Sequence, residues 1–139
     1  MENRYLFRGK RIDNGEWVEG YLSYPFCTKK GNESYYFYAK DSLGFFCRCV
    51  VDASTICQCT GLKDKNGNLI FENDICDRKE EYPEIVKYNN GDWTLDYSYS
   101  KGKESGYCYC NLGFYALERK YVEVIGNIFD NPELLEVQK

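Results

Sequence analysis

The chain of 139 residues contains no histidine, and no stretch of it is apolar enough for long enough to cross a bilayer. Without imidazole, general acid–base catalysis would depend on Asp, Glu, Tyr, Lys or Cys. No paired carboxylates and no nucleophile beside a base can be identified in the sequence, so we predict that the chain is not an enzyme. The N-terminal residues lack the pattern of a secretory signal. We therefore predict a cytoplasmic protein with no membrane partner.

The familiar ligand-binding motifs are also missing. The sequence contains no phosphate-binding P-loop, no Gly-x-Gly-x-x-Gly, no Gly-x-Ser-x-Gly and no repeat of solenoid period. We therefore predict no cofactor.

The chain also lacks an excess of positive charge. The formal net charge is −4 and the pI is about 5.0, which argues against a generally basic nucleic-acid-binding protein but leaves a local basic patch possible. Aromatic residues make up 17% of the chain, with 14 Tyr and 8 Phe. This composition favours strands over helices, and tyrosine also suits interfaces.

The eight cysteines occur mainly in Cys-x-Cys pairs, and no Cys-x-x-Cys pair is present. Residues i and i+2 of a strand point to the same face, so each pair predicts two small apolar side chains on one buried face. Buried free thiols are the preferred interpretation. A structural zinc site and disulfide bonds remain alternatives.

The most informative stretch runs from Thr60 to Asp77. Asn66-Gly67 predicts a type I′ hairpin turn, in which both central residues have positive φ. Asn73 is predicted to occupy the left-handed region at a tight corner between two strands. Asp64 and Asp74 are interpreted as turn residues whose carboxylates accept backbone N–H groups, rather than as a catalytic pair.

Other segments give simpler predictions. Asn14-Gly15 and Asn90-Gly91 predict two further hairpin turns. Residues 78–81 predict a solvated charged loop. Asn131-Pro132 predicts the start of a short C-terminal helix, with the asparagine as its N-cap.

Three parts of the chain resemble the YopX-like family of phage and prophage proteins. They are Phe7-Arg8-Gly9-Lys10-Arg11 near the start, Thr60-Gly61-Leu62-Lys63-Asp64-Lys65-Asn66-Gly67 in the middle, and Val124-Ile125-Gly126-Asn127 near the end. Cys59, Asn73 and Cys76 stand where the family usually has an aromatic residue, glycine and valine.

The resemblance implies an all-β protein with a small SH3-like barrel in its C-terminal part and a phage or prophage setting, but no activity. We predict an N-terminal β unit over residues 1–58 packed against the barrel over residues 59–139, which ends in the short helix. The structural signature comprises Thr60, Gly61, Leu62, Asp64, Asn66, Gly67, Asn73, Asp74, Gly126 and Asn127.

The preferred functional hypothesis is a binding or assembly module that contacts an unidentified protein and also associates with itself. It depends on the many tyrosines and on the aromatic run at residues 35–38. The alternative is a nucleic-acid-binding accessory protein that uses an N-terminal basic and aromatic strand; its contact residues would be Arg4, Arg8, Lys10 and Arg11. An enzyme with a cysteine or carboxylate site is the weakest alternative.

Overall fold

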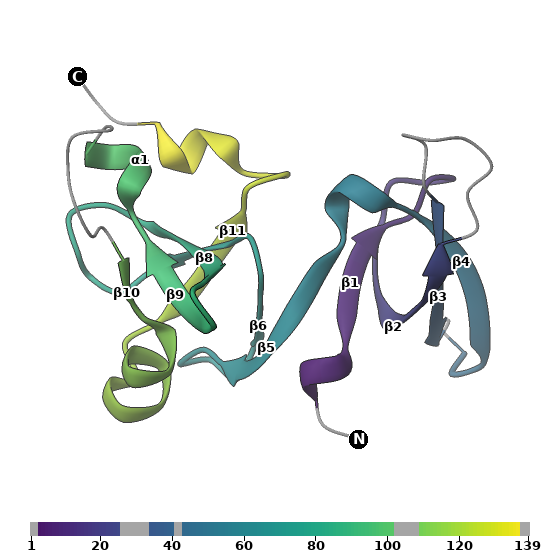
Figure 1. Ribbon diagram of the computed structural model, residues 1–139, viewed down its shortest axis with the longest axis horizontal. Helices are drawn as coiled ribbons and strands as arrows, with labels where there is room; N and C mark the ends of the chain where they lie inside the picture. The colour runs from purple at the N-terminus through teal and green to yellow at the C-terminus, as the bar shows by residue number, and fades with distance from the viewer. Residues whose placement is uncertain (1–2, 26–33, 41–42, 102–108, 137–139) are drawn as a thin grey trace. The chain divides into compact units, whose positions relative to one another are not determined.

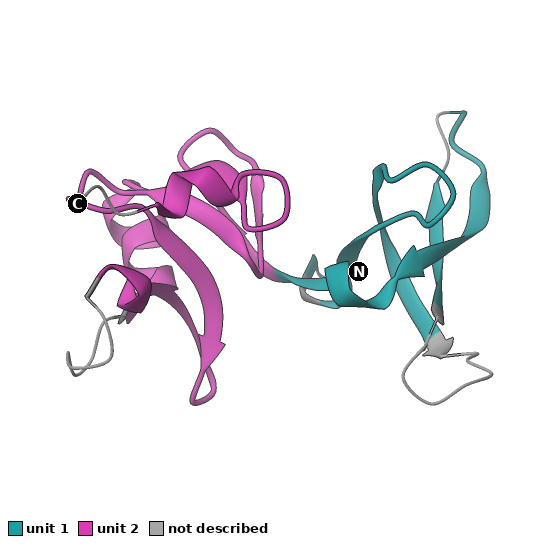
Figure 2. Cartoon of the chain, turned by 90° about the horizontal axis from the view of Figure 1, so that it is seen from above, with its two compact units in different colours: residues 1–59 teal, residues 60–139 magenta. Residues whose placement is uncertain are grey.

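A computed structural model describes residues 3–25, 34–40, 43–101 and 109–136. The chain is all-β with a few short helices, as predicted, and it divides into two compact units, residues 1–59 and 60–139 (Figure 2). No helix among the described residues is long and apolar enough to span a membrane.

Unit 1, residues 1–59, is an antiparallel sheet in which β1 to β4 follow one another as neighbours (Figure 1). Its strand order is β4-β3-β2-β1-β5, and β5 continues into unit 2, where β6 is its neighbour. The elements are η1 (Asn3–Tyr5), β1 (Phe7–Lys10), β2 (Trp17–Pro25), β3 (Ser34–Lys40), β4 (Phe46–Asp52), η2 (Ala53–Thr55) and β5 (Cys57–Lys63).

The core of unit 1 lies on one face of this sheet. Phe37 and Ala39 of β3 are buried, as are Cys49 and Val51 of β4, which shows the two-residue period of a strand with one covered face. Gly9 of β1 packs directly against this core. A Cβ at this position would lie only 3.2 Å from Val51 Cβ, so the absence of a side chain allows the close approach. The residues between these buried ones point to the opposite face.

Unit 2, residues 60–139, contains a second antiparallel sheet with the strand order β10-β9-β8-β7-β11. Its buried core comprises Ile70, Cys76, Val86, Leu95, Leu112, Ala116 and Val122. The elements are β6 (Leu69–Phe71), β7 (Asp74–Asp77), β8 (Glu84–Asn89), β9 (Asp92–Asp96), α1 (Ser98–Lys101), β10 (Tyr109–Asn111), the π-helix η3 (Phe114–Arg119), β11 (Glu123–Asn127) and η4 (Pro132–Leu135).

The described strand pairings of unit 2 do not close into the SH3-like barrel that the resemblance implied. Within the described residues, β10 pairs with β9 alone and β11 pairs with β7 alone, so both are edge strands of an open sheet. The segment expected to complete a barrel, β11, extends the sheet beside β7 instead.

The structure confirms some of the predicted turn conformations and contradicts one. Asn90 and Gly91 have φ of 51° and 85° and join β8 to β9, as a type I′ turn requires. Asn73 has a φ of 67°, which confirms its left-handed conformation. The type I′ prediction at Asn66-Gly67 is wrong, because Gly67 has positive φ and Asn66 does not.

The short C-terminal helix is present as a single 3-10 turn, η4, with Pro132 at its start. Asn131 precedes it but makes no side-chain cap hydrogen bond to the helix. Its Oδ1 instead accepts a hydrogen bond from Asn127 N at 3.2 Å, so this side chain ties η4 back to the end of β11.

Six cysteines are free thiols: Cys47, Cys49, Cys57, Cys59, Cys76 and Cys110. Cys57 and Cys59 are both buried, as the preferred interpretation predicts for a Cys-x-Cys pair, whereas Cys47 beside Cys49 is only half-buried, as is Cys110. No cluster of potential metal ligands occurs in the ranges that the structure describes, and Cys27 and Cys108 lie outside them.

Candidate functional site

The outer face of the unit 1 sheet, opposite its core, combines aromatic rings with cations across four adjacent strands. Strand register places Tyr21 beside Tyr38 and Tyr38 beside Arg48, while Lys10 lies opposite Trp17 and Lys40 opposite Phe46. We call this surface the aromatic face and define it by Lys10, Trp17, Tyr21, Tyr36, Tyr38, Lys40, Phe46 and Arg48.

The cations of the aromatic face lie over its rings. The Arg48 guanidinium is 4.3 Å from the centroid of Tyr36, and Lys40 Nζ is 5.3 Å from that of Phe46. Lys10 Nζ is 5.3 Å from the Trp17 centroid. These are cation–π distances, so positive charge and ring surface are interleaved rather than separated.

Several of these rings are open to solvent. Phe46 is 71% exposed, Tyr38 48% and Tyr21 37%. Neighbouring strands of a sheet are about 4.8 Å apart, so Tyr21 and Tyr38 present two accessible rings side by side. Isolated exposed apolar residues are ordinary, but a group of them on one sheet face indicates a contact surface.

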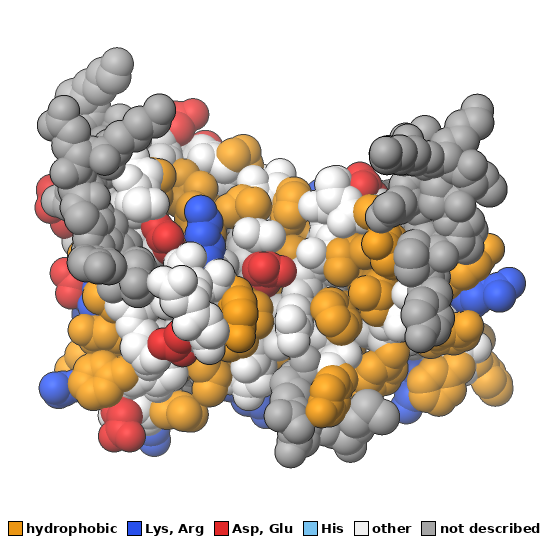
Figure 3. Space-filling model, viewed as in Figure 1, with side chains coloured by type: hydrophobic (Ala, Val, Ile, Leu, Met, Phe, Trp, Pro, Cys, Tyr) orange, Lys and Arg blue, Asp and Glu red, His pale blue; other side chains and the backbone are white. Residues whose placement is uncertain are grey.

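Charge is divided unequally between the two units. Unit 1 contains 8 Lys and Arg against 7 Asp and Glu, whereas unit 2 contains 10 against 15, which together give the net charge of −4. In the view of Figure 3, acidic side chains gather mainly over unit 2. The acidity of the whole chain therefore does not describe the surface of unit 1.

The structure places the four predicted nucleic-acid contacts differently from one another. Lys10 belongs to the aromatic face. Arg8 lies 4.8 Å over Trp17, but its Nε and Nη2 are buried. Arg11 is held in an ion pair with Asp13 at 2.7 Å, and Arg4 lies in η1 with its side chain outside the description.

Sequence reasoning did not identify Lys40 and Arg48 as part of the surface. The signal was available, since both alternate with core residues of β3 and β4. What the sequence could not provide was the pairing that brings these two strands beside β1 and β2.

The signature residues form a different kind of site, centred on Asp64, whose side chain is buried. Its Oδ1 accepts hydrogen bonds from Asn66 N and Asn68 N at 3.0 and 2.9 Å, and its Oδ2 accepts one from Val124 N at 3.0 Å. Burial would raise the pKa of this carboxyl, but the three backbone donors outweigh burial and hold the pKa below its usual value. Asp64 therefore fixes a turn.

A second group of signature residues joins β7 to β11. Asp74 lies opposite Asn127 and its Oδ2 accepts a hydrogen bond from Phe71 N at 2.8 Å, so the capping predicted for both aspartates is confirmed. Asn73 O accepts a hydrogen bond from Ile128 N at 3.0 Å. Asn127 Oδ1 accepts from the N–H groups of Phe129 and Asp130, in the turn between β11 and η4.

The backbone at Gly126 lies so close to the Asn131 side chain that there is no room for a Cβ. A Cβ at this position would lie 2.5 Å from Asn131 Oδ1, so a larger residue would displace the side chain that holds η4 to β11.

The remaining signature residues lie where β5 enters unit 2. Thr60 Oγ1 donates to Ile70 O at 2.8 Å and accepts from Leu62 N at 3.1 Å. Gly61 has a φ of 81°, which favours glycine, and Leu62 packs against the unit 2 core. Asn66 Nδ2 donates to Glu123 Oε1 at 3.3 Å, and Gly67 N donates to Asp64 O.

The chain as a whole matches a known family. The family model described as YopX protein matches residues 6–136, nearly the whole chain. The chain belongs to the YopX family. Most of the signature residues hold backbone groups of the turns and strand ends in place, so they have a structural role in this YopX chain.

A solved structure supports the same relationship. The crystal structure of protein EF1440 from Enterococcus faecalis is similar to this YopX chain with a TM-score of 0.53 and 27% identity, and the match covers 94% of this chain and 96% of that one. No curated protein matches the chain.

Proposed function

We propose that this YopX-family chain is a non-enzymatic binding module, and that the aromatic face of unit 1 binds single-stranded nucleic acid. The observation that carries the proposal is that Lys10, Lys40 and Arg48 share one sheet face with the exposed rings of Tyr21, Tyr38 and Phe46. The proposal includes a cytoplasmic location and the phage or prophage setting that the resemblance implied.

The chemistry of a single strand suits this surface. Unpaired bases stack on aromatic side chains, each stacked base contributing about 1–3 kcal/mol, and phosphates are attracted to neighbouring cations. Tyr21 and Tyr38 are accessible from the same side as Arg48, so a base on a ring would bring its phosphate within reach of a guanidinium. An open sheet face also accommodates a flexible strand better than a rigid duplex.

The experiment is fluorescence anisotropy with a labelled single-stranded oligonucleotide and the full chain. Tyr38→Ala should weaken binding about tenfold, the loss expected for one stacked base. Tyr121→Ala is the matched control, because Tyr121 is 49% exposed and Lys79 Nζ lies 5.8 Å from its ring centroid in unit 2. Equal effects of the two substitutions would contradict the proposal.

Salt gives a second readout. Three phosphate contacts predict that log Kobs falls with log salt at a slope of about −2, and Arg48→Ala should reduce the magnitude of that slope by roughly 0.7. Arg119→Ala is the control, since Arg119 lies 5.4 Å over Phe114 in unit 2. Binding that does not respond to salt would exclude this mode.

Protein contact, including self-association, is the second candidate. Leu43 and Phe45, in the β3–β4 connection, are 79% and 69% exposed, and the neighbouring strand β4 is last in the sheet order, with its outer side bridged by Arg11 at Val51. Sedimentation velocity at about 50 µM tests self-association. A dimer that dissociates on Leu43→Ser, in a chain that does not bind oligonucleotide, would favour this candidate over the first.

A further inference from the structure

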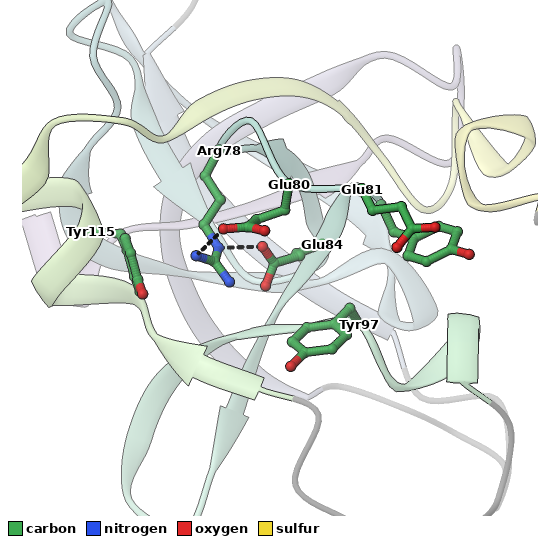
Figure 4. A pocket seen from close by; sticks show the side chains of 7 residues that line it. Arg78, Glu80, Glu81, Glu84, Tyr97 and Tyr115 are labelled. Atoms are coloured by element: carbon green, nitrogen blue, oxygen red, sulfur yellow. Dashed lines mark hydrogen bonds and ion pairs between the residues drawn. The ribbon is translucent and has the colours of Figure 1, made fainter. Parts of the chain in front are cut away.

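A pocket of about 330 Å³ in unit 2 combines acidic and aromatic side chains (Figure 4). It lies beside the start of β8 and the segment that precedes it. Its described lining comprises Arg78, Glu80, Glu81, Tyr82, Glu84, Tyr97 and Tyr115. A volume of this size accommodates a small ligand or one long side chain.

Arg78 is committed to contacts within the protein. Its Nε donates to Glu84, its Nη1 donates to Glu80 Oε1 at 3.2 Å, and its Nη2 donates to Cys110 Sγ at 3.2 Å. The guanidinium also lies 4.2 Å from the centroid of the Tyr115 ring. The one cation among the described lining residues is thus balanced by two carboxylates, which makes the pocket a poor site for an anion.

Glu84 is the unusual group of the pocket. Its side chain is 1% exposed, and Arg78 engages Oε1. Its Oε2 is buried and has no hydrogen-bond partner among the described residues. A buried carboxylate oxygen without a donor is costly, so a ligand that brings an N–H group to it would be stabilised.

We propose that this pocket binds a primary alkylammonium group, which donates to Glu84 Oε2 and lies beside the ring of Tyr97 (Figure 4). Glu81 supplies a further negative charge that Arg78 does not engage. Aromatic faces attract cations, and an ammonium group satisfies a lone carboxylate oxygen with a charged donor. A polyamine and a lysine side chain of a partner protein carry the same group.

The test is an amide NMR titration of the full chain with n-butylammonium, with n-butanol and butyrate as neutral and anionic counterparts. Butylammonium should shift the signals of residues 80–84 with a Kd on the order of 1 mM, whereas the two counterparts should not bind there. Binding of butanol with equal affinity, or tighter binding of butyrate, would overturn the proposal.

Substitutions in the pocket test whether Glu84 and Glu81 bind the ammonium group. Glu84→Gln should weaken butylammonium at least tenfold, and Glu81→Gln, a substitution of an exposed residue, should weaken it about threefold. Glu118→Gln removes the same charge at an exposed position outside the described lining and should have no effect. A Glu84→Gln chain with a native spectrum and unchanged affinity would disprove the site, and Glu81→Gln decides the question if Glu84→Gln does not fold.

Two larger cationic probes distinguish a polyamine from the lysine side chain of a partner protein as the ligand. Spermidine binding more tightly than Nα-acetyl-lysine methylamide would assign the pocket to a polyamine, and the reverse order would assign it to a lysine of a partner protein. With either probe, Glu84→Gln must again weaken binding. These measurements use no residue of the aromatic face, so their outcome is separate from that of the nucleic-acid proposal.

Discussion

Asp64 Oδ2 accepts a hydrogen bond at 3.0 Å from the backbone N–H of Val124, a residue 60 positions further along the chain. The other carboxylate oxygen holds the turn between β5 and β6 through Asn66 N and Asn68 N. One side chain therefore closes a local turn and fastens it to β11. In this chain the stretch that carries the family resemblance also stabilises a long-range contact.

Asp64→Asn should destabilise the chain by about 3 kcal/mol, because hydrogen bonds to a charged group contribute about 1.5–3 kcal/mol and an amide offers acceptor geometry on one side only. The free energy of unfolding in urea measures this loss at pH 7. Glu118→Gln, at an exposed position, is a control for charge removal. Equal stability of the two variants would show that Asp64 does not fasten the turn to β11.

The pH dependence of stability provides an independent check on Asp64. Its pKa is lower in the folded chain than the ordinary value of 3.8, so the folded state favours the ionised form. The resulting stabilisation is complete above pH 3.8 and is lost as the pH falls through the lowered value. Urea unfolding of the native chain and of Asp64→Asn should therefore converge in stability under acid conditions.

Gly126→Ala should cost about 1–3 kcal/mol, since the new methyl group would lie 2.5 Å from Asn131 Oδ1 and must displace it. Gly113→Ala is a matched control. A Cβ there meets Asn111 Oδ1 at 3.4 Å and the backbone is already helical, with φ of −59°. Thermal unfolding should separate the two substitutions by several degrees.

The sequence was most informative where one residue type has one physical use. Asparagine tolerates the left-handed region, which correctly predicts the positive φ of Asn73 and of Asn90 in the Asn90-Gly91 hairpin turn. The same rule failed at Asn66 because a side chain intervened. Asp64 binds the N–H groups on both sides of the turn, which supports a wider loop with positive φ at Gly67 alone.

Contacts between distant segments could not be predicted from a single sequence. Residues 78–81 had the composition of a solvated loop, yet the Arg78 side chain is 8% exposed because Glu84 and Tyr115 enclose it. The aromatic face depends in the same way on which strands pair. Alternation predicts which side chains share a face of one strand, but not which strands become neighbours.

Thiol reactivity should follow burial. Cys49, Cys57, Cys59 and Cys76 are buried, and burial raises the pKa of both Cys49 and Cys110, so few thiolates form at neutral pH. Titration with a thiol reagent should leave at least these four groups unmodified in the native chain and modify all eight after denaturation. Rapid modification of all eight in native buffer would contradict the buried arrangement.

Arg78→Met isolates the buried ion pair. Removing one partner leaves the Glu84 carboxylate buried without its cation, and such losses typically cost about 3–5 kcal/mol. Burial is the largest influence on Glu84 and, with Glu80 and Asp96 nearby, it raises the pKa of this carboxyl even beside Arg78. Without the guanidinium the pKa should rise further.

The sign of the pH effect follows from that direction. A carboxyl whose pKa is higher in the folded chain than its ordinary 4.5 is a neutral acid in the folded state at low pH, and folding becomes less favourable as the pH rises through the raised value. Arg78→Met should thus lose more stability at pH 8 than at pH 5. Arg78→Met combined with Glu84→Gln should recover most of the loss at pH 8, because no charge then remains to be buried. If the single variant were equally destabilised at both pH values, the cost would come from packing around Tyr115 rather than from an unpaired carboxylate.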